Sequence, residues 1–290
     1  MKRRKAQRIR ICQKQTYKYN RDSCADSVPS KTLSFPKLVP SACATQTDAG
    51  TPGRFLSANW ALYFLRFMLS DLRFFINEEF YTRAVSPQQL DLLLADGWRH
   101  FGEHFFRYNI SPHEFELRRV LPLRIRLKNF TLSKSQRRII KRNQDLQTVI
   151  CPIEITSEKE ILFKKHKQRF KHSVPNSLYD FLSFAPADVP CEAFEVNVYA
   201  QEKLLAASFF DVGATAVSAV YAIFETQESS RSLGIFTMLL TIDYASKSGK
   251  SFYYPGYAYE GNSFYDYKKR FSALETFDWN GNWEKFEFKL

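Results

Sequence analysis

Ten Lys or Arg residues and no acidic residue lie between Arg118 and Arg142, so the chain concentrates positive charge in one segment. The densest part reads SKSQRRIIKRN over 133–143, with five cations around two isoleucines. Such a run predicts a positive surface that attracts anionic partners such as nucleic acid. A solvated helix face is the other interpretation, although solvated faces usually mix charges of both signs.

A second chemical element is Arg231-Ser-Leu-Gly234, between a strand-like run that ends near Glu225 and a helical run that starts near Gly234. Backbone N–H groups at a helix N-terminus can bind phosphate. The acyl-CoA N-acyltransferase fold uses a loop of type Arg/Gln-x-x-Gly-x-Gly/Ala. The segment resembles the first half of that loop, with Phe236 in place of the second small residue. A plain helix cap is the alternative interpretation.

The elements that position these segments follow from hydrophobic spacing and turn residues. Ser86, Pro87 and Gly97 predict the start and end of a helix over 86–97. Two short strands are expected near Trp98–Phe101 and Phe105–Tyr108. Alternating residues predict a half-buried strand over 119–130, with Leu123, Ile125 and Leu127 inward and Arg124, Arg126 and Lys128 outward.

The basic run itself reads as a helix that begins after Ser133 or Ser135. Leu132, Ile139 and Leu146 recur at seven-residue steps, which gives one apolar stripe for docking on a core. Further helices are expected over 157–171 and 176–184. The remaining pattern predicts an antiparallel meander, a helix, a buried strand and a final helix–strand pair, with the meander over 191–200, 203–213 and 215–225, the helix over 232–249 and the strand over 251–257.

Several blocks, taken in order, resemble the arginyl/leucyl-tRNA–protein transferases, closest to the bacterial branch that acts on N-terminal Asp and Glu. GWRHFG (97–102) and LPLRI…SKSQRRIIKRNQDL carry the similarity in the N-terminal half. In the C-terminal half it falls on Asp211, Ser218, Val220, Tyr221, Arg231 to Gly234, Tyr254, Gly256, Tyr257, Tyr267, Lys268, Phe271 and Glu275. The resemblance spans about 80 to 283.

The resemblance implies transfer of Arg or Leu from charged tRNA to proteins that begin with Asp or Glu, which marks them for degradation. Such a transfer needs alignment, proton removal and oxyanion stabilisation. The expected catalytic residues are Asp211, Tyr221, Tyr254 and Lys268. The expected substrate- and tRNA-binding residues are Arg124, Arg137, Arg138, Lys141, Arg142, Arg231, Ser232, Gly234 and Tyr257. A packing or surface role is the alternative for each catalytic candidate.

The implied fold is α+β, an acyl-CoA N-acyltransferase (GNAT)-like mixed sheet flanked by helices, with a small N-terminal α/β module. The expected divisions are a disordered basic extension (1–54), the N-terminal module (55–114) and the transferase domain (115–290). Nine cations against Asp22 give residues 1–22 a charge of +8, which leaves +4 of the total +12 for the rest. The extension could also be a transit peptide or a mis-assigned start.

Five widely spaced cysteines indicate unpaired thiols in a reducing cytoplasm. We expect no metal, no small cofactor and a monomer. Charges break the most apolar run (59–75), so no membrane span is predicted.

Departures from the family pattern indicate a divergent member: no Cys lies between Cys43 and Cys151, Pro255 replaces Leu, and Ala273 replaces Pro. A CoA-dependent N-acyltransferase and an inactive tRNA-binding adaptor are the alternatives.

Overall fold

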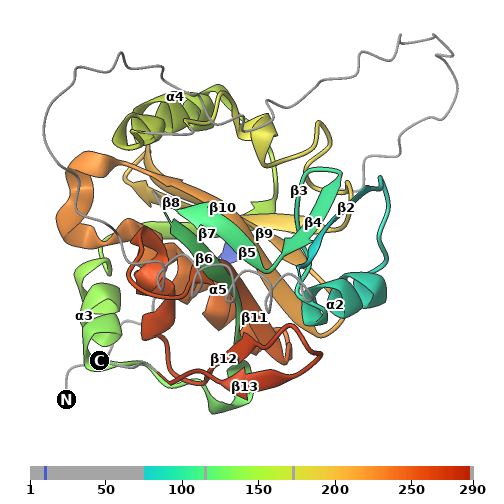
Figure 1. Ribbon diagram of the computed structural model, residues 1–290. Helices are drawn as coiled ribbons and strands as arrows, with labels where there is room; N and C mark the ends of the chain where they lie inside the picture. The colour runs from blue at the N-terminus through green and yellow to red at the C-terminus, as the bar shows by residue number, and fades with distance from the viewer. Residues whose placement is uncertain (1–9, 12–74, 114–115, 172–173, 288–290) are drawn as a thin grey trace, which may run out of the picture. The chain divides into compact units, whose positions relative to one another are not determined.

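The computed structural model describes residues 10–11, 75–113, 116–171 and 174–287 (Figure 1). All of them belong to one of the two units of the chain, the unit made of Met1–Gln13 and Phe74–Leu290. The predicted extension lies outside the described residues except for Arg10 and Ile11, and the run 59–75 except for Phe75. No helix in the described ranges is long and apolar enough to cross a membrane.

One mixed sheet of ten strands organises the described residues. Its order is β1-β7-β8-β9-β10-β11-β6-β12-β13, and β5 pairs with β6 beside this path. The β10–β11 and β1–β7 pairs are parallel and the others antiparallel. The strands are β1 (Arg10–Ile11), β5 (Ile110–His113), β6 (Glu116–Arg126), β7 (Gln147–Pro152), β8 (Ala193–Ala200), β9 (Lys203–Val212), β10 (Ala216–Phe224), β11 (Phe252–Tyr259), β12 (Leu274–Phe277) and β13 (Trp283–Lys285).

A separate three-stranded sheet, with the helix α2 between its first and second strands in sequence, lies between β1 and β5 of the large sheet along the chain. Its order is β2-β4-β3, with β2 over Asn77–Tyr81, β3 over Arg99–Phe101 and β4 over His104–Tyr108. The helix α2 (Pro87–Ala95) begins at a capping box of Ser86 and Gln89, and Gly97 follows with φ +82°. The predicted helix and both predicted strands are therefore confirmed.

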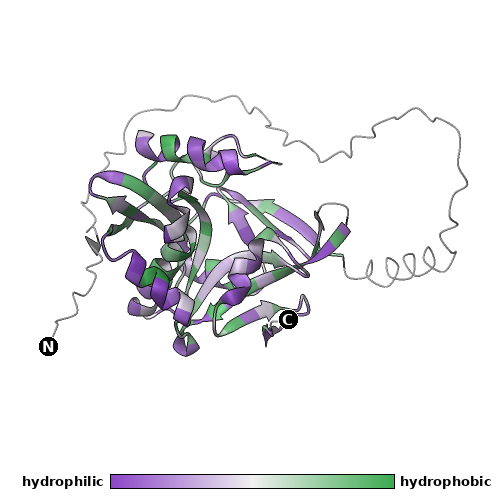
Figure 2. Ribbon diagram, turned by 90° about the vertical axis from the view of Figure 1, so that its left-hand side faces the viewer, coloured by the Kyte–Doolittle hydropathy of each residue, from purple (hydrophilic) through white to green (hydrophobic). Residues whose placement is uncertain are grey.

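Two helices cover opposite faces of the large sheet. The helix α5 (Leu233–Lys247) packs with Phe210 in one hydrophobic cluster, and α4 (Ser157–His166) packs with Phe209 in another. These adjacent β9 residues point to opposite faces, as strand geometry requires. Hydropathy colouring shows helices banded in purple and green, which fits helices with one face on a core (Figure 2). The predicted α+β architecture, a mixed sheet flanked by helices, is confirmed.

The basic helix α3 (Lys134–Arg142) also forms as predicted, with a capping box between Ser133 and Gln136 and with Ile139 buried. The expected meander is β8-β9-β10, and its three antiparallel strands keep the predicted order. The remaining helical turns are short and of 3-10 type: η2 (Leu127–Asn129), η3 (Lys167–Arg169), η4 (Leu178–Asp180), η5 (Thr226–Arg231) and η6 (Phe264–Arg270).

The helix predicted over 176–184 is wrong, because only the turn η4 forms there. A capping box between Ser177 and Asp180 caps the N-terminus of this turn. Phe181 and Leu182 then pack toward the α4 side of the sheet. Likewise, the helix predicted over 157–171 ends at His166 and continues only as η3.

The predicted outward position of Arg124 is also wrong. Its side chain is buried, and Nε donates to Glu275 Oε2 at 2.6 Å. The guanidinium lies over the rings of Phe252 (4.2 Å) and Trp283 (4.3 Å). Glu275 also accepts from Arg126 Nε at 2.9 Å. This pair fixes β12 to β6 through charge as well as through the strand ladder.

We expect Glu275→Gln to lower the free energy of unfolding by about 3 kcal/mol, because it leaves a buried guanidinium without its counter-charge. Urea unfolding would measure the loss. The control is Glu284→Gln on the neighbouring strand, where the side chain is exposed; it should stay within about 0.5 kcal/mol of the parent. Equal effects of the two substitutions would contradict a special role for the buried pair.

Candidate active site

The site begins where two parallel strands separate. β10 and β11 are paired only from Ala216–Phe252 to Ser218–Tyr254. Beyond that point the register of β10 against β9 shifts between Ala219 and Tyr221, while β11 continues along β6. A cavity of about 760 Å³ opens there and is lined by residues of both strands. This volume suits a small organic group with part of its carrier.

The N-terminus of α5 forms part of the cavity rim. Ser232, Leu233 and Gly234 all line the cavity, and Ser232 has φ +54°. A Cβ atom added at Gly234 would lie 3.0 Å from the Phe224 ring. The glycine therefore lets the helix start against that ring. The structure places two predicted binding residues, Ser232 and Gly234, in the cavity.

Arg231, in contrast, is engaged in ion pairs. Its Nη1 and Nη2 donate to the two carboxylate oxygens of Asp145 at 2.9 and 2.8 Å, and its Nε donates to Glu228 at 3.1 Å. These bonds raise the pKa of Arg231 above its ordinary value. The residue joins the turn after α3 to the cavity rim, while its predicted contact with substrate stays a prediction.

The basic face of α3 lies beside this rim. Arg137, Arg138, Lys141 and Arg142 are exposed. Arg142 donates to the carbonyl of Ser230, and Asn143 Nδ2 donates to the carbonyl of Arg231 at 2.9 Å. These bonds fix the C-terminal end of α3 to the loop that lines the cavity. Of the four cations predicted to bind tRNA, Arg142 contacts the rim loop directly, and the other three lie exposed on the same helix.

Lys268 is a predicted catalytic residue that does line the cavity. Its Nζ donates to the carbonyl of Tyr257 at 2.9 Å and lies 4.9 Å from the centre of the Tyr265 ring. Burial, with a smaller contribution from the charge of Arg99, lowers the pKa of Lys268 to about 7. Gly256 (φ +92°) leaves room for the amine, since an added Cβ would lie 3.2 Å from it. Lys268 can therefore accept a proton near neutral pH.

Two predicted tyrosines share this cavity. The ring of Tyr221 stacks on Phe181 with centroids 3.8 Å apart. Its hydroxyl is buried and has no hydrogen-bond partner among the described residues. Burial raises the pKa of Tyr221 to about 12, so the hydroxyl keeps its proton and can donate. Tyr257 donates to the carbonyl of Gly97 at 2.6 Å, which ties β11 to the turn between α2 and β3.

Besides Arg231 and the four cations of α3, three predicted site residues do not line this cavity. Tyr254 is buried in a cluster with Leu90 and Leu94 and contacts the Trp283 ring. Arg124 lies in the pair with Glu275. Asp211 borders a separate hollow of about 10 Å³. A role for these three residues in contact with substrate stays a prediction.

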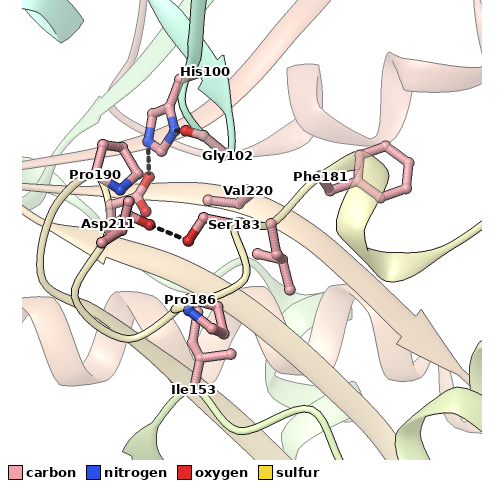
Figure 3. Close-up of a pocket in the computed structure, with 11 residues that line it drawn as sticks. His100, Gly102, Ile153, Phe181, Ser183, Pro186, Pro190, Asp211 and Val220 are labelled. Carbon is pink, nitrogen blue, oxygen red and sulfur yellow. Dashed lines mark hydrogen bonds and ion pairs between the residues drawn. The ribbon is translucent and has the colours of Figure 1, made fainter. Parts of the chain in front are cut away.

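Asp211 is held by His100 across the two sheets (Figure 3). His100 Nε2 lies 2.9 Å from Asp211 Oδ2, and Nδ1 lies 2.9 Å from the carbonyl of Gly102. Burial lowers the pKa of His100, but the charge and hydrogen bond of Asp211 outweigh it, so the pKa is raised overall. The raised pKa favours the imidazolium form, which would donate from both nitrogens and make this a buried ion pair.

His100, Cys191 and Asp211 are also close enough to share a metal ion, because their ligand atoms lie within 4.8 Å of one another. Their mutual contacts account for the arrangement without one. Asp211 accepts from His100, and the Cys191 thiol is hydrogen-bonded to the same carboxylate. We interpret the group as an ion pair with a bonded thiol.

The sequence reasoning missed the two arginines that line the cavity, Arg99 and Arg169. The guanidinium of Arg169 lies about 5 Å from three phenylalanine rings, at 4.8 Å from Phe264, 5.0 Å from Phe224 and 5.2 Å from Phe170. Arg99 is the third residue of GWRHFG, a block used for the resemblance without assigning it a role. The GWRHFG block was therefore the sequence signal that could have identified Arg99.

Comparison with known proteins now identifies the family. Residues 158–278 match the family model "Arginine-tRNA-protein transferase, C terminus". The aspartate/glutamate leucyltransferase of Xanthomonas euvesicatoria pv. vesicatoria is 33% identical over 178 residues, which cover 57% of this chain and 70% of that protein. The chain belongs to the arginyl/leucyl-tRNA–protein transferase family. The aspartate/glutamate leucyltransferase of Saccharophagus degradans is 27% identical to this chain, and the match covers 70% of this chain and 85% of that protein.

The family match spans most of the cavity. It includes Tyr221, the 231–234 loop and Lys268, while α3 and Arg99 precede it. Solved structures overlap only loosely with this chain. The C-terminal domain of a putative lysylphosphatidylglycerol synthetase from Agrobacterium fabrum has a TM-score of 0.36 at 15% identity, and the match covers 68% of this chain and 60% of that domain's chain. The structure of FemX has a TM-score of 0.37 at 11% identity, and the match covers 71% of this chain and 70% of FemX. The fold description therefore depends on the strand order above.

The His100–Asp211 pair makes stability depend on pH. The pKa of His100 is raised by folding, so its stabilisation is complete below the unfolded value of about 6.5 and is lost as the pH rises through the folded value. We expect the stability advantage of the parent over Asp211→Asn to be larger at pH 6 than at pH 9. Urea unfolding at both values would measure it.

The control substitution for this measurement is Glu79→Gln. Glu79 bonds His104 at 2.8 Å in an exposed pair, so its substitution should cost little at either pH. A difference between parent and Asp211→Asn that does not change with pH would show that His100 is not charged in the folded protein.

Proposed function

We propose that this chain is an aminoacyl-tRNA–protein transferase, which moves leucine from charged tRNA to the N-terminus of proteins beginning with Asp or Glu. Its similarity to proteins named aspartate/glutamate leucyltransferase supports the reaction class. The observation that carries the proposal is the cavity at the β10–β11 separation. It joins a lysine with a pKa of about 7 to a rim that carries the basic helix α3.

The chemistry asks little of the protein beyond alignment and proton transfer. The aminoacyl ester is already activated, and the acceptor α-amine attacks its carbonyl carbon. A C–N bond forms while the ester C–O bond to ribose breaks. Neutral Lys268 accepts the proton of the amine and returns it to the leaving ribose hydroxyl. The Tyr221 hydroxyl, which has no partner among the described residues, donates to the carbonyl oxygen that becomes negative during the attack.

The cavity lining favours an apolar donor residue. Val220, Leu233, Ile235 and Met238 all contribute to its wall. Glu228 is the carboxylate among the described lining residues, and it pairs with Arg231. A donated arginine would need a counter-charge in the cavity, whereas a leucine side chain gains from apolar burial. We therefore prefer leucine to arginine.

The basic face of α3 would hold the tRNA. Phosphate contacts by Arg137, Arg138, Lys141 and Arg142 would place the acceptor end of the tRNA at the neighbouring rim.

The ion pairs of Arg231 weaken the alternative of a CoA-dependent acyltransferase, because that enzyme would need the 231–234 loop to bind the pyrophosphate of CoA. The partners are charged tRNA and the acceptor protein. We place the reaction in the cytoplasm, where the enzyme would act as a monomer and mark proteins for N-degron degradation.

The primary test is transfer of labelled leucine or arginine from charged tRNA to peptides that begin with Asp, Glu or Ala. We expect labelling of the acidic peptides from Leu-tRNA. The Arg137→Ala/Arg138→Ala variant should bind tRNA more weakly, and the slope of log affinity against log salt should fall by roughly 0.9 per lost phosphate contact. A folded enzyme that labels no peptide from either donor would rule out the proposed reaction, and tRNA binding without transfer would favour the adaptor.

A matched control removes two cations elsewhere. Arg83→Ala/Lys285→Ala deletes side chains that are 80% and 84% exposed and lie on other elements. It should leave tRNA affinity and its salt dependence close to those of the parent. Equal weakening by both double variants would mean that net charge, rather than the α3 surface, sets tRNA binding.

The role of Lys268 has its own test in the pH dependence of transfer. With saturating substrates we expect the rate to rise with an inflection near the pKa of about 7. Lys268→Met should lose this inflection and transfer about 10²-fold more slowly, because no neutral amine accepts the proton. The control is Arg270→Met, an exposed cation on the same η6 turn. An unchanged profile in Lys268→Met would remove Lys268 from the proton transfer.

A further inference from the structure

Arg99 stands apart from the other buried cations of the described residues. Arg124, Lys159 and Lys269 are buried and each pairs with a carboxylate, at 2.6 Å (Glu275), 2.6 Å (Glu195) and 2.8 Å (Asp266). Arg99 is only 6% exposed and has no such ion pair within the described part of the chain. A buried charge without a partner is costly, so a retained one points to a ligand.

The contacts of Arg99 leave donor capacity unused. Its Nη1 donates to the carbonyl of Trp98 at 2.6 Å, and Nη2 makes a long contact of 3.4 Å with the carbonyl of Leu123. Nε has no partner among the described residues. A guanidinium has five N–H donors, these two contacts use two of them, and a pair of its N–H groups can match the two oxygens of a carboxylate.

The surroundings keep Arg99 fixed without neutralising it. Its guanidinium lies 5.0 Å from the Tyr254 ring and 5.5 Å from the Tyr257 ring. Asp211 is the acidic group whose charge acts on Arg99, but that carboxylate is already bonded to His100 and Cys191. Arg99 lines the cavity, so an anion can come from there.

We propose that Arg99 determines acceptor specificity by binding the side-chain carboxylate of the N-terminal Asp or Glu. This inference rests on the proposed function. Arg99 and Lys268 line the same cavity and both contact Tyr257: the guanidinium lies 5.5 Å from its ring, and Nζ donates to its carbonyl at 2.9 Å. A single acidic residue can therefore place its carboxylate on Arg99 and its α-amine toward Lys268.

A tRNA phosphate is the other anion that could reach the cavity. The exposed cations of α3 already offer phosphate contacts at the rim, whereas Arg99 is buried at the β3 side of the cavity. A phosphodiester at Arg99 would require a nucleotide to enter beside the aminoacyl group. The side chain of an acceptor N-terminus is smaller and carries the flat carboxylate that a guanidinium matches.

The experiment compares Arg99→Met with the parent on matched acceptor peptides that begin with Asp or Asn. The ratio of kcat/KM for Asp over Asn should fall at least about 100-fold in Arg99→Met, since one partner of a buried charge pair is removed. Arg99→Lys should retain part of the preference. A ratio that is unchanged in Arg99→Met would overturn the proposal. An equal loss on both peptides, with weaker tRNA binding, would also overturn it in favour of phosphate.

Thermal unfolding of the free protein provides a second readout. Asp-Ala dipeptide should raise the Tm of the parent more than Asn-Ala does, and this difference should vanish in Arg99→Met. Without ligand, Arg99→Met should match or exceed the parent Tm, whereas Arg124→Met, which breaks a satisfied pair, should lower it. A strongly lowered Tm in Arg99→Met would mark Arg99 as structural. If Asp-Ala and Asn-Ala raise the Tm of the parent equally, the proposal is also overturned. This comparison uses the parent alone and does not depend on whether the variants fold.

These readouts separate the inference from the function on which it rests. If the parent transfers leucine to no peptide, the proposed function fails. An Asp-Ala shift that depends on Arg99 would still establish the carboxylate site in that case. Normal transfer with an unchanged Asp preference in Arg99→Met would retain the function and reject the role of Arg99.

Discussion

The site depends on one constraint: β10 and β11 stop pairing after Ser218 and Tyr254. Each strand keeps its other neighbour, β9 or β6, so the sheet stays continuous at the base while its middle opens. The chain must cross between these parallel strands through α5, and the N-terminus of that helix therefore lies at the opening. The cavity follows from strand order, and the reactive side chains are placed on its walls.

Buried ion pairs brace the elements around this opening. Arg124 and Glu275 join β6 to β12, Lys159 and Glu195 join α4 to β8, and His100 and Asp211 join the two sheets. Each of these cations has its acidic partner within the described residues. Lys268 and Arg99 lack such acidic partners in the described structure, and both line the cavity. In our proposal, the cations with an acidic partner stabilise the fold, whereas Lys268 and Arg99 act on the substrates.

Local patterns predicted the elements well, but charge partners far apart in sequence could not be foreseen. The capping box of Ser133 and Gln136 and the 3.6-residue spacing suffice for α3. Alternation along β6 predicted Arg124 to point outward, because nothing near it in sequence indicates that Glu275, 151 residues later, pairs with it from the neighbouring strand β12. The family block identified Lys268 as a candidate, yet its lowered proton affinity arises from burial that no spacing reveals.

The departures from the family pattern fall where the fold tolerates them. Pro255 lies where the β11–β6 register shifts between Tyr253 and Gly256, so its missing N–H interrupts a ladder that is already irregular. Ala273 has φ +53°, a conformation closed to the proline usual there, and it lies in the turn before β12. Neither change removes Lys268 or Tyr221 from the cavity. The divergence is therefore compatible with an active transferase, and it gives no independent support to an inactive adaptor.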